Sequence, residues 1–595
     1  MTAAVTENRP SSLPSHVRQR DITRAVLIAL VLLACAAIAM LLITIFWLSF
    51  IEGAPGDAGL GYTLANYAAI FGDPFTYRVI RNTFAFLAVT LIVSFSLGLP
   101  IAWLMERTDF PGKPVVFTLM TVALLIPGFA VALGWVFLLH PRIGLINLAL
   151  MSLFDLSQAP FNIGNIVWMG VVEGLSLTPL AFIMTSVVMR SMDPALEEAA
   201  AMSGAKPWQA VMRVTARVLW PGLLAAAIYV SAVCFASFDV PAILGMTQRI
   251  FTFSTYVFFS LTPTEGLPEY GNVAALGMLM VVFAVILSWC YRLVQRQAPR
   301  YAVVTGKGYR PRILPLGRGK TWAVTFVALY FIISQMLPIL MLVWAAGLPY
   351  LQTPSIAAFD QLSWKNFYDI PTELLTSSII NTVILMLVVP TITVALSVAV
   401  SWVVLRSKMR GRGVIDFFAF LPVTVPPIVF SIAALLLALF VLNRIVPIYG
   451  TVWILVLVYV IARLSYGTRM TNSAMIQIHH ELDEAAQVSG AGTGGVLRSV
   501  LAPLLAPTML YAWIWIALLS YRELSLPVVL SVPNNLPFSV LVWGYVQSSA
   551  YGKASAATLI MLVLMVPFLF VYWLVARRVG LVASPAAVVR ASATS

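Results

Sequence analysis

The chain has 595 residues, of which 61% are hydrophobic and only 10% are charged, and its mean hydropathy is +0.94. A soluble protein of this length carries far more charge, so the composition excludes that class and indicates a polytopic membrane protein. The net charge of +13 would favour nucleic-acid binding in a soluble chain. Here it fits the basic loops that orient membrane proteins.

Twelve apolar segments are long enough to span a bilayer, and they fall into two groups of six. The first group lies at roughly 25–50, 81–105, 114–139, 166–189, 217–243 and 271–291. The second lies at roughly 322–349, 377–404, 415–441, 450–470, 503–531 and 553–576. We therefore expect an all-α integral membrane fold with a tail at 1–24, a first repeat at 25–291, a linker at 292–321, a second repeat at 322–577 and a tail at 578–595.

The linker determines the predicted orientation, because it has eight basic residues and no acidic one. These are Arg292, Arg296, Arg300, Lys307, Arg310, Arg312, Arg318 and Lys320. Basic residues accumulate in cytoplasmic loops, so we expect the linker and both termini in the cytoplasm, with 51–80 and 350–376 outside.

One pattern, E-A-A-x-x-S-G-A, occurs at 198–205 and again 286 positions later at 484–491. Each copy lies in a polar loop between the fourth and fifth predicted spans of its repeat, at 190–217 and at 471–502. The pattern predicts a short helix that ends at a glycine suited to the left-handed C-cap conformation. Two copies at equivalent places favour a docking element over an ordinary loop helix.

Other matched residues predict that the two halves arose by duplication. Asn82-Thr83 matches Asn381-Thr382 and Pro127 matches Pro426 at an offset of 299, whereas Pro221 matches Pro507 and Pro241 matches Pro527 at 286. The offset changes once, which fits a longer outer loop at 140–165 in the first half. A fixed register on both sides of one insertion is typical of an internal repeat. Six spans separate equivalent residues, so the repeats should be parallel, with a substrate path between them.

Ionisable residues inside spans are costly and indicate function by default. Asp239 precedes Pro241 in the fifth span of the first repeat, and Arg522 and Glu523 precede the equivalent Pro527. Two interpretations stay open. The three residues line a translocation path or its outer gate, or they have no transport role. In the second case Arg522 and Glu523 pair, or Asp239 reaches a base across the repeat axis, or these positions already lie at the water interface. We expect Glu173 and Arg463 to lie at the water interface, near the outer ends of the fourth spans.

The sequence offers no catalytic set and no metal site. Its three cysteines lie in apolar runs, and its four histidines do not have metal-ligand spacing. Gly319-Lys320-Thr321 is the nearest approach to a phosphate-binding loop, but Leu314 stands where that loop needs its first glycine. We therefore expect that this chain is not an enzyme and binds no cofactor.

The repeated E-A-A-x-x-x-G pattern resembles that of permease subunits of binding-protein-dependent ABC importers. Two six-span repeats in one chain resemble the fused permeases of the ferric-iron uptake group, and thiamine and 2-aminoethylphosphonate importers have similar fused members. The family pattern continues with an apolar residue, matched by Val214 and Val500, and then a proline. Pro503 matches that proline, but Arg217 replaces it in the first repeat.

The resemblance implies that both motifs are coupling helices, each docked on one of two separate ATPase subunits. It assigns these contacts to Glu198, Ala199, Ala200 and Gly204 in the first repeat and to Glu484, Ala485, Ala486 and Gly490 in the second. It also implies that ATP and Mg²⁺ bind to the ATPase subunits. A periplasmic or lipid-anchored binding protein would deliver the solute, and the chain would lie in a bacterial inner membrane.

Ferric iron is the first expected substrate, and thiamine, 2-aminoethylphosphonate and polyamines are alternatives. The alternative from another class is a twelve-span secondary transporter driven by an ion gradient. Asp239 and Glu523 are the carboxylates that such a transporter would use. It gives no reason for the duplicated motif.

Overall fold

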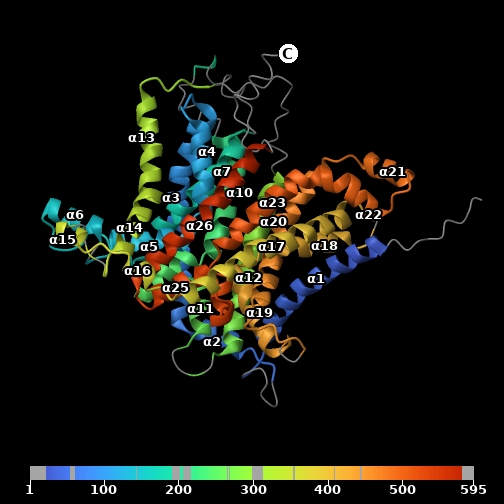
Figure 1. Cartoon of the computed structure of the whole chain (residues 1–595), viewed down its shortest axis with the longest axis horizontal. Helices are drawn as coiled ribbons and strands as arrows, with labels where there is room; N and C mark the ends of the chain where they lie inside the picture. Colours follow the sequence, from blue (N-terminus) through green and yellow to red (C-terminus); the bar gives the residue numbers. More distant parts are fainter. Residues whose placement is uncertain are drawn as a thin grey trace, which may run out of the picture.

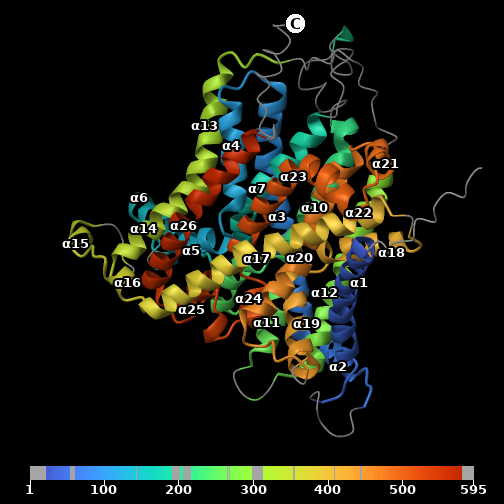
Figure 2. The same cartoon turned by 45° about the vertical axis from the view of Figure 1, so that its right-hand side comes forward.

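Helices make up almost all of the structure, a computed structural model (Figures 1 and 2). It describes residues 22–53, 61–142, 144–190, 202–204, 216–263, 266, 268–297, 313–350, 352, 355–407, 409–442 and 445–578. Within those ranges, ten helices are long and apolar enough to cross a membrane, or twelve if each of two bent pairs is one span. The predicted all-α membrane fold is confirmed.

The first repeat contains the long helices α1 (Ile22–Leu48), α3 (Pro74–Arg107), α4 (Lys113–Leu125), α5 (Gly128–Leu139), α7 (Ile166–Arg190), α10 (Ala216–Ala236) and α12 (Tyr270–Gln297). Its shorter helices are α2 (Ala65–Gly72), α6 (Leu145–Phe154), η2 (Pro241–Gly245), η3 (Met246–Gln248) and α11 (Phe253–Leu261).

The second repeat begins with one span made of α13 (Gly319–Phe331), η5 (Ile332–Met336) and α14 (Leu337–Gly347). Its other long helices are α17 (Thr372–Leu405), α18 (Arg412–Phe420), α19 (Pro427–Phe440), α20 (Val452–Ile476), α23 (Ala502–Tyr521) and α26 (Tyr551–Arg578). Its shorter helices are α15 (Ile356–Phe359), α16 (Lys365–Tyr368), η6 (Leu421–Val423), α21 (His480–Val488), α22 (Thr493–Val496), η8 (Leu497–Leu501), α24 (Pro527–Leu530), η9 (Pro533–Asn535) and α25 (Phe538–Gln547).

The third span of each repeat is bent sharply, which the sequence did not predict. The angle is 91° between α4 and α5 and 106° between the segment Arg412–Val423 and α19. Both breaks fall at the matched prolines Pro127 and Pro426, and a proline disfavours helical geometry at the preceding residue. After each break the chain turns inward. All residues of α5 from Phe129 to Leu139 are buried, as suits a helix that is apolar on every side.

The fifth spans end earlier than predicted. Helices α10 and α23 stop at Ala236 and Tyr521, and the chain continues through short helices instead of running on to 243 and 531. The matched Pro241 and Pro527 each start one of these short helices, η2 and α24. A proline suits the first turn of a helix, where its missing amide is not needed.

The two repeats interlock through their first spans. Helix α1 packs against α19 of the second repeat, and α14 packs against α5 of the first (Figures 1 and 2). Each also contacts the last span of its own repeat, α12 or α26. An added Cβ at Gly277 of α12 would lie 2.7 Å from Ile45 of α1 and 3.8 Å from Val429 of α19, so three helices meet there.

Gly134 marks the tightest part of this interlock and gives a test of it. A Cβ at Gly134 would lie 2.6 Å from the Cβ of Pro338 in α14. Gly134→Ala is therefore expected to lower stability by about 1–3 kcal/mol, the usual cost of overpacking, seen as a lower Tm of the purified chain in detergent. Gly544→Ala in α25 meets nothing within 4 Å and is the matched control. An unchanged Tm for Gly134→Ala would contradict this packing.

Helices α3 and α7 form the most extensive long pair in the first repeat, through a small-residue motif that was not predicted from the sequence. Gly170 and Gly174 of α7 stand four residues apart, and their added Cβ atoms would lie 2.7 and 2.6 Å from Val89 and Val93 of α3. The hydroxyl of Thr90 donates to the carbonyl of Gly170 at 3.2 Å. Paired glycines let helix backbones approach closely in membranes. This contact fixes the rotation of α7.

The end of the linker is bound to the loop after α3. The Leu314 amide donates to the Arg107 carbonyl at 2.9 Å, and the Leu316 amide donates to Asp109 Oδ1 at 2.8 Å. Lys320 Nζ lies 3.2 Å from Asp109 Oδ2. The Leu316 amide, followed by Lys320, holds the pKa of Asp109 below its usual value. This part of the linker and the loop after α3 therefore lie on the same side of the protein.

Candidate functional site

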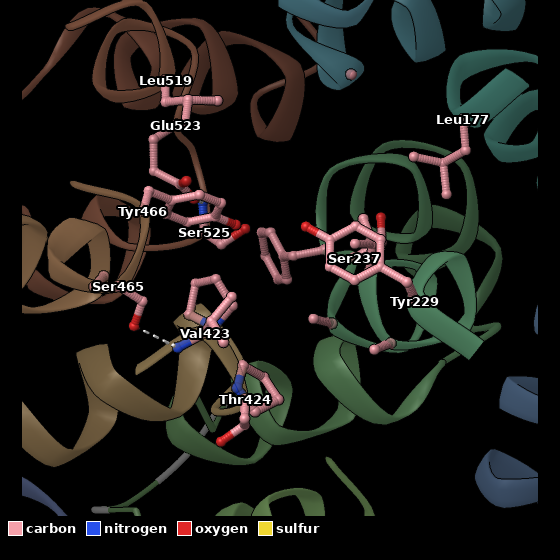
Figure 3. A pocket seen from close by; sticks show the side chains of 18 of the residues that line it. Leu177, Tyr229, Ser237, Val423, Thr424, Ser465, Tyr466, Leu519, Glu523 and Ser525 are labelled. Atoms are coloured by element: carbon pink, nitrogen blue, oxygen red, sulfur yellow. Dashed lines mark hydrogen bonds between the residues drawn. The ribbon is translucent and has the colours of Figure 1, made fainter. Parts of the chain in front are cut away.

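A cavity of about 840 Å³ lies between the two repeats. Both broken spans line it, through Leu124 to Gly128 in one repeat and Phe420 to Pro427 in the other. Helices α7, α10 and α12 complete one wall, and α20 and the end of α23 complete the other. Figure 3 shows Leu177, Tyr229 and Ser237 of the first repeat facing Tyr466, Glu523 and Ser525 of the second.

The cavity brings together the ionisable residues predicted for a path. Asp239, Arg522 and Glu523 all line it. Glu173 and Arg463 line it as well, and their residues are only 5% and 7% exposed. The expectation that these two lie at the water interface is therefore wrong. Each sits well inside its helix, on a face that neighbouring helices cover.

Glu523 forms a buried ion pair with Arg463 of α20. Its other oxygen, Oε1, accepts the amides of Ser525 and Leu526 at 3.0 and 3.3 Å, just before α24. No ion pair within 4 Å joins the neighbouring Arg522 to Glu523. The interpretation that these two residues pair with each other is therefore wrong, because Glu523 points to α20 and to the amides after it.

Arg522 reaches across to the first repeat. Its Nη1 donates to the carbonyl of Leu124, near the end of α4. The last carbonyls of a helix lack partners and carry its negative dipole end, which attracts a cation. The guanidinium also interacts electrostatically with Asp239, Glu523 and Glu173. No ion pair within 4 Å joins Arg522 to Asp239, so a direct pair of Asp239 with this base across the repeats is not formed.

Asp239 lies beside the first turn of α5. Its Oδ2 would be 3.2 Å from a Cβ added at Gly128, the first residue of that helix. A carboxylate is stabilised there by the positive end of the helix dipole. The broken span therefore contributes opposite dipole ends to the cavity, with Asp239 near the start of α5 and Arg522 near the end of α4.

The charged residues of the cavity differ between equivalent positions of the two repeats. At the offset of 286, Arg463 corresponds to Leu177 and Glu523 to Ser237. In the same register, Asp239 corresponds to Ser525 and Glu173 to Tyr459. The first repeat thus supplies two carboxylates, and the second supplies an ion pair, Arg469 and Arg522. A mostly apolar chamber with a few charges of both signs suits a small charged solute. Among the described residues, no group of three or more His, Cys, Asp or Glu side chains could hold a metal ion.

Aromatic residues from both repeats meet at two levels of the cavity. Tyr229 and Tyr466 point toward one another from opposite walls (Figure 3). Away from the motif loops, Phe238 contacts Phe258 and Trp543, with ring centroids 5.3 and 6.1 Å apart. All three of these rings are buried. Phe238 lines the cavity and the other two rings pack against it, so the three rings border the chamber on this side. Separating the repeats there would part Trp543 from the other two.

The repeated Asn-Thr pair holds these closing helices. Thr83 Oγ1 accepts the Phe253 amide at the start of α11, and Thr382 Oγ1 accepts the Phe538 amide at the start of α25, both at 2.9 Å. Asn82 and Asn381 donate to the carbonyls of Phe251 and Leu536, both at 3.3 Å. The duplicated pair thus positions α11, which carries Phe258, and α25, which carries Trp543.

Thr382→Val is expected to lower stability by about 1–3 kcal/mol, because it leaves the buried Phe538 amide without an acceptor. The thermal unfolding of the purified chain measures this loss. Thr382→Ser keeps the hydroxyl and should behave nearly as the wild type. If the valine and serine variants unfold at the same temperature, the hydroxyl does not anchor α25.

The second motif forms the predicted short helix, α21. Glu484 and Ala485 are exposed, whereas Ala486 is half-buried and packs against a cluster that includes Val403 and Met475. Gly490 ends the motif with φ +88°, in the left-handed region that its glycine permits.

Of the first motif, Glu198, Ala199 and Ala200 lie outside the described residues. Gly204 is described, and it has φ +83°, so both motif glycines adopt the predicted left-handed conformation. The two apolar residues at equivalent places in the motifs, Met202 and Val488, are 86% and 90% exposed. Both residues occupy variable positions (x) of the repeated pattern.

Comparison with known proteins gives two kinds of similarity. A family model described as binding-protein-dependent transport system inner membrane component matches residues 98–298 and 391–581. The chain is 23% identical over 519 residues to the ferric transport system permease protein FbpB of Actinobacillus pleuropneumoniae, covering 85% of this chain and 72% of that protein. It is 26% identical over 530 residues to the probable ABC transporter permease protein y4fN of Sinorhizobium fredii, covering 85% and 88%.

A shorter relative matches less than half of the chain. The inner membrane ABC transporter permease protein YcjO of Escherichia coli is 25% identical over 231 residues, which is 77% of that protein but 38% of this chain. The chain therefore has the form of two joined units, each of which matches the family model once.

Proposed function

Since the chain belongs to the family of binding-protein-dependent transport system inner membrane components, we propose that it moves ferric iron from a solute-binding protein into the cytoplasm with ATP hydrolysed by separate subunits. The chain is the permease of an ABC importer, with both repeats in one polypeptide. Ferric iron is supported by relatives named as ferric transport system permeases, which align with 85%, 74% and 81% of this chain.

Two ATPase subunits would each hold one motif loop. The observation that carries this proposal is the pair of motifs at equivalent places, each with a nearly fully exposed apolar residue, Met202 or Val488. Exposed apolar side chains rimmed by polar residues are typical of protein interfaces. ATP and Mg²⁺ would bind to these subunits, in keeping with relatives that are permease subunits.

The cavity would be the transport chamber. When the ATPase subunits close, the motif loops would approach each other and the repeats would rock. This motion parts Phe238 and Phe258 from Trp543 and admits the solute from a periplasmic or lipid-anchored binding protein. Hydrolysis would reset the repeats. Asp239 and Glu173 would face a cation in the chamber, whereas the opposite wall has the Arg463–Glu523 pair together with Arg469 and Arg522 and is net positive.

The proposed setting is a bacterial inner membrane with both termini in the cytoplasm. The many apolar helices support a multi-pass membrane protein. The basic linker supports a cytoplasmic position for the motif loops, because it follows an even number of predicted spans.

The proposal is tested by uptake in proteoliposomes that contain the full chain, its ATPase and its binding protein loaded with ferric iron. ATP inside the vesicles should drive iron uptake. Glu198→Arg combined with Glu484→Arg should abolish uptake and loosen ATPase binding while the permease remains inserted. Glu481→Arg is the control, because Glu481 is exposed on α21 outside the motif.

The other candidates give distinct results in the same vesicles. Uptake of thiamine, 2-aminoethylphosphonate or a polyamine in place of iron would overturn the proposed substrate and leave the assignment as an ABC importer intact. Uptake driven by an ion gradient without the ATPase would overturn the proposal in favour of a secondary transporter. Normal uptake by the double variant would overturn the coupling role of the motifs.

A further inference from the structure

One arginine, Arg406, joins the ends of α17 and α20 to the start of α21. Arg406 follows the last residue of α17, and its Nη2 donates to the carbonyls of Met475 and Ile478 at 3.0 and 2.6 Å. These carbonyls lie at the end of α20, where backbone acceptors lack helical partners. The guanidinium therefore fastens the end of α17 to the end of α20.

The same side chain holds α21. Arg406 Nε lies 3.4 Å from Oδ2 of Asp483, in the first turn of that helix. The two side chains are only 5% and 11% exposed, so solvent screens this ion pair weakly. Removing one partner of a buried pair leaves the other charge uncompensated, which is far more costly than losing a surface pair.

Helix α21 thus has two different faces. Asp483 and Ala486 point into the protein, toward Arg406 and the cluster of Val403 and Met475. Leu482, Ala485 and Val488 are exposed. The outer face is free for a partner, whereas the inner face is fixed to the protein by the buried ion pair.

The connection continues to the cavity. Ser401 of α17 and Thr471 of α20 share a hydrogen bond of 2.5 Å between their hydroxyls. This bond adds to the packing of α17 on α20. Helix α20 carries Arg463 and Tyr466, which line the cavity. A displacement of α21 therefore reaches the cavity wall through Arg406 and α20.

The first repeat has the equivalent arginine. Arg107, in the last turn of α3, is buried, and its Nη2 donates to the Met189 carbonyl in the last turn of α7 at 3.2 Å. At the offsets that relate the repeats, Arg107 matches Arg406 and Met189 matches Met475. The residue that corresponds to Asp483 is Glu197, which lies outside the described residues.

We propose that Arg406 and Asp483 are positioning residues that transmit the movement of α21 to α17 and α20, and so couple ATP hydrolysis to transport. This rests on the proposed function, in which α21 docks on an ATPase subunit. If the pair only stabilised the fold, its removal would lower stability and leave the amount of solute moved per ATP unchanged. If the pair transmits the movement of α21, its removal lowers the amount of solute moved per ATP.

The test measures solute uptake and ATP hydrolysis in proteoliposomes that contain the full chain, its ATPase and its loaded binding protein. Asp483→Asn removes the charge and leaves the outer face of α21 intact. The ATPase should still bind and hydrolyse ATP, and the uptake per ATP should fall at least tenfold. Asp483→Glu, which copies the residue of the first repeat, should restore most of the ratio. Asp109→Asn removes an exposed pair with Lys320, neither of which lines the cavity, and should have no effect.

A wild-type ratio in Asp483→Asn would overturn the inference, and so would a loss of uptake that only parallels a loss of bound ATPase. If Asp483→Asn does not assemble, Arg406→Lys decides. Lysine keeps the charge, but its single nitrogen replaces Nη2, which binds the two carbonyls, and Nε, which faces Asp483. A lower ratio in that assembled variant supports the inference, and a wild-type ratio overturns it. If the wild-type chain itself neither binds the ATPase nor transports with ATP, the proposed function has failed instead.

Discussion

Replacing Glu523 by alanine is expected to lower the free energy of unfolding by about 3–5 kcal/mol, the usual cost of removing one partner of a buried ion pair. Arg463 would remain buried without its anion. The remaining charge beside it would be Arg522, which is also positive and would repel it. The amides of Ser525 and Leu526 would also lose their acceptor. The thermal unfolding of the purified chain in detergent measures the loss as a lower Tm.

The chain itself supplies the control for this prediction. The first repeat has Leu177 and Ser237 where the second has Arg463 and Glu523. The double variant Arg463→Leu with Glu523→Ser copies that neutral arrangement, so it should recover most of the stability lost in Glu523→Ala. If Glu523→Ala unfolds at the wild-type temperature, or if the double variant is as unstable as the single one, the pair does not stabilise the fold.

Placing aspartate at both Met202 and Val488 is expected to weaken binding of the ATPase at least a hundredfold. Interface residues that anchor a complex contribute about 2–4 kcal/mol each, and every 1.4 kcal/mol is about tenfold in affinity. Both side chains are almost fully exposed, so the substitutions should change the stability of the permease by no more than about 0.5 kcal/mol. Binding of the purified ATPase to the full chain in nanodiscs gives the measurement.

Ile313→Asp is the matched control, because it places the same charge on an exposed apolar residue at the end of the linker. That variant should bind the ATPase as the wild type does. Either single variant should retain one docking site and bind more tightly than the double variant. Wild-type affinity in the double variant would mean that the ATPase docks elsewhere.

Hydropathy predicted the number and order of the spans because each segment must match the apolar thickness of a bilayer. It did not predict the bends at Pro127 and Pro426, because the residues on both sides of each proline are equally apolar. The contact of Gly170 and Gly174 with α3 had a signal in the sequence, a pair of glycines four residues apart, which was not used.

The cavity was predicted in part. Asp239, Arg522 and Glu523 were found because charges inside apolar spans are few. Their partners could not be derived, since the pairing of Glu523 with Arg463 depends on α20 lying beside the end of α23. Glu173 and Arg463 were misplaced because distance from the end of a span says nothing about which face of a helix is covered. The contact between Arg406 and Asp483 required the fold itself.

The contact of α5 with α14 determines when the first repeat can finish packing during synthesis of the protein. Pro338 leaves the ribosome about 10–40 s after Gly134 at ordinary rates of translation. Until then the apolar surface of α5 has no α14 to cover it, and α1 likewise waits for α19. The first repeat therefore cannot be completed before the second is inserted. Because both belong to one polypeptide, the missing helices arrive at a high effective concentration beside their sites and need not be found among other proteins in the membrane.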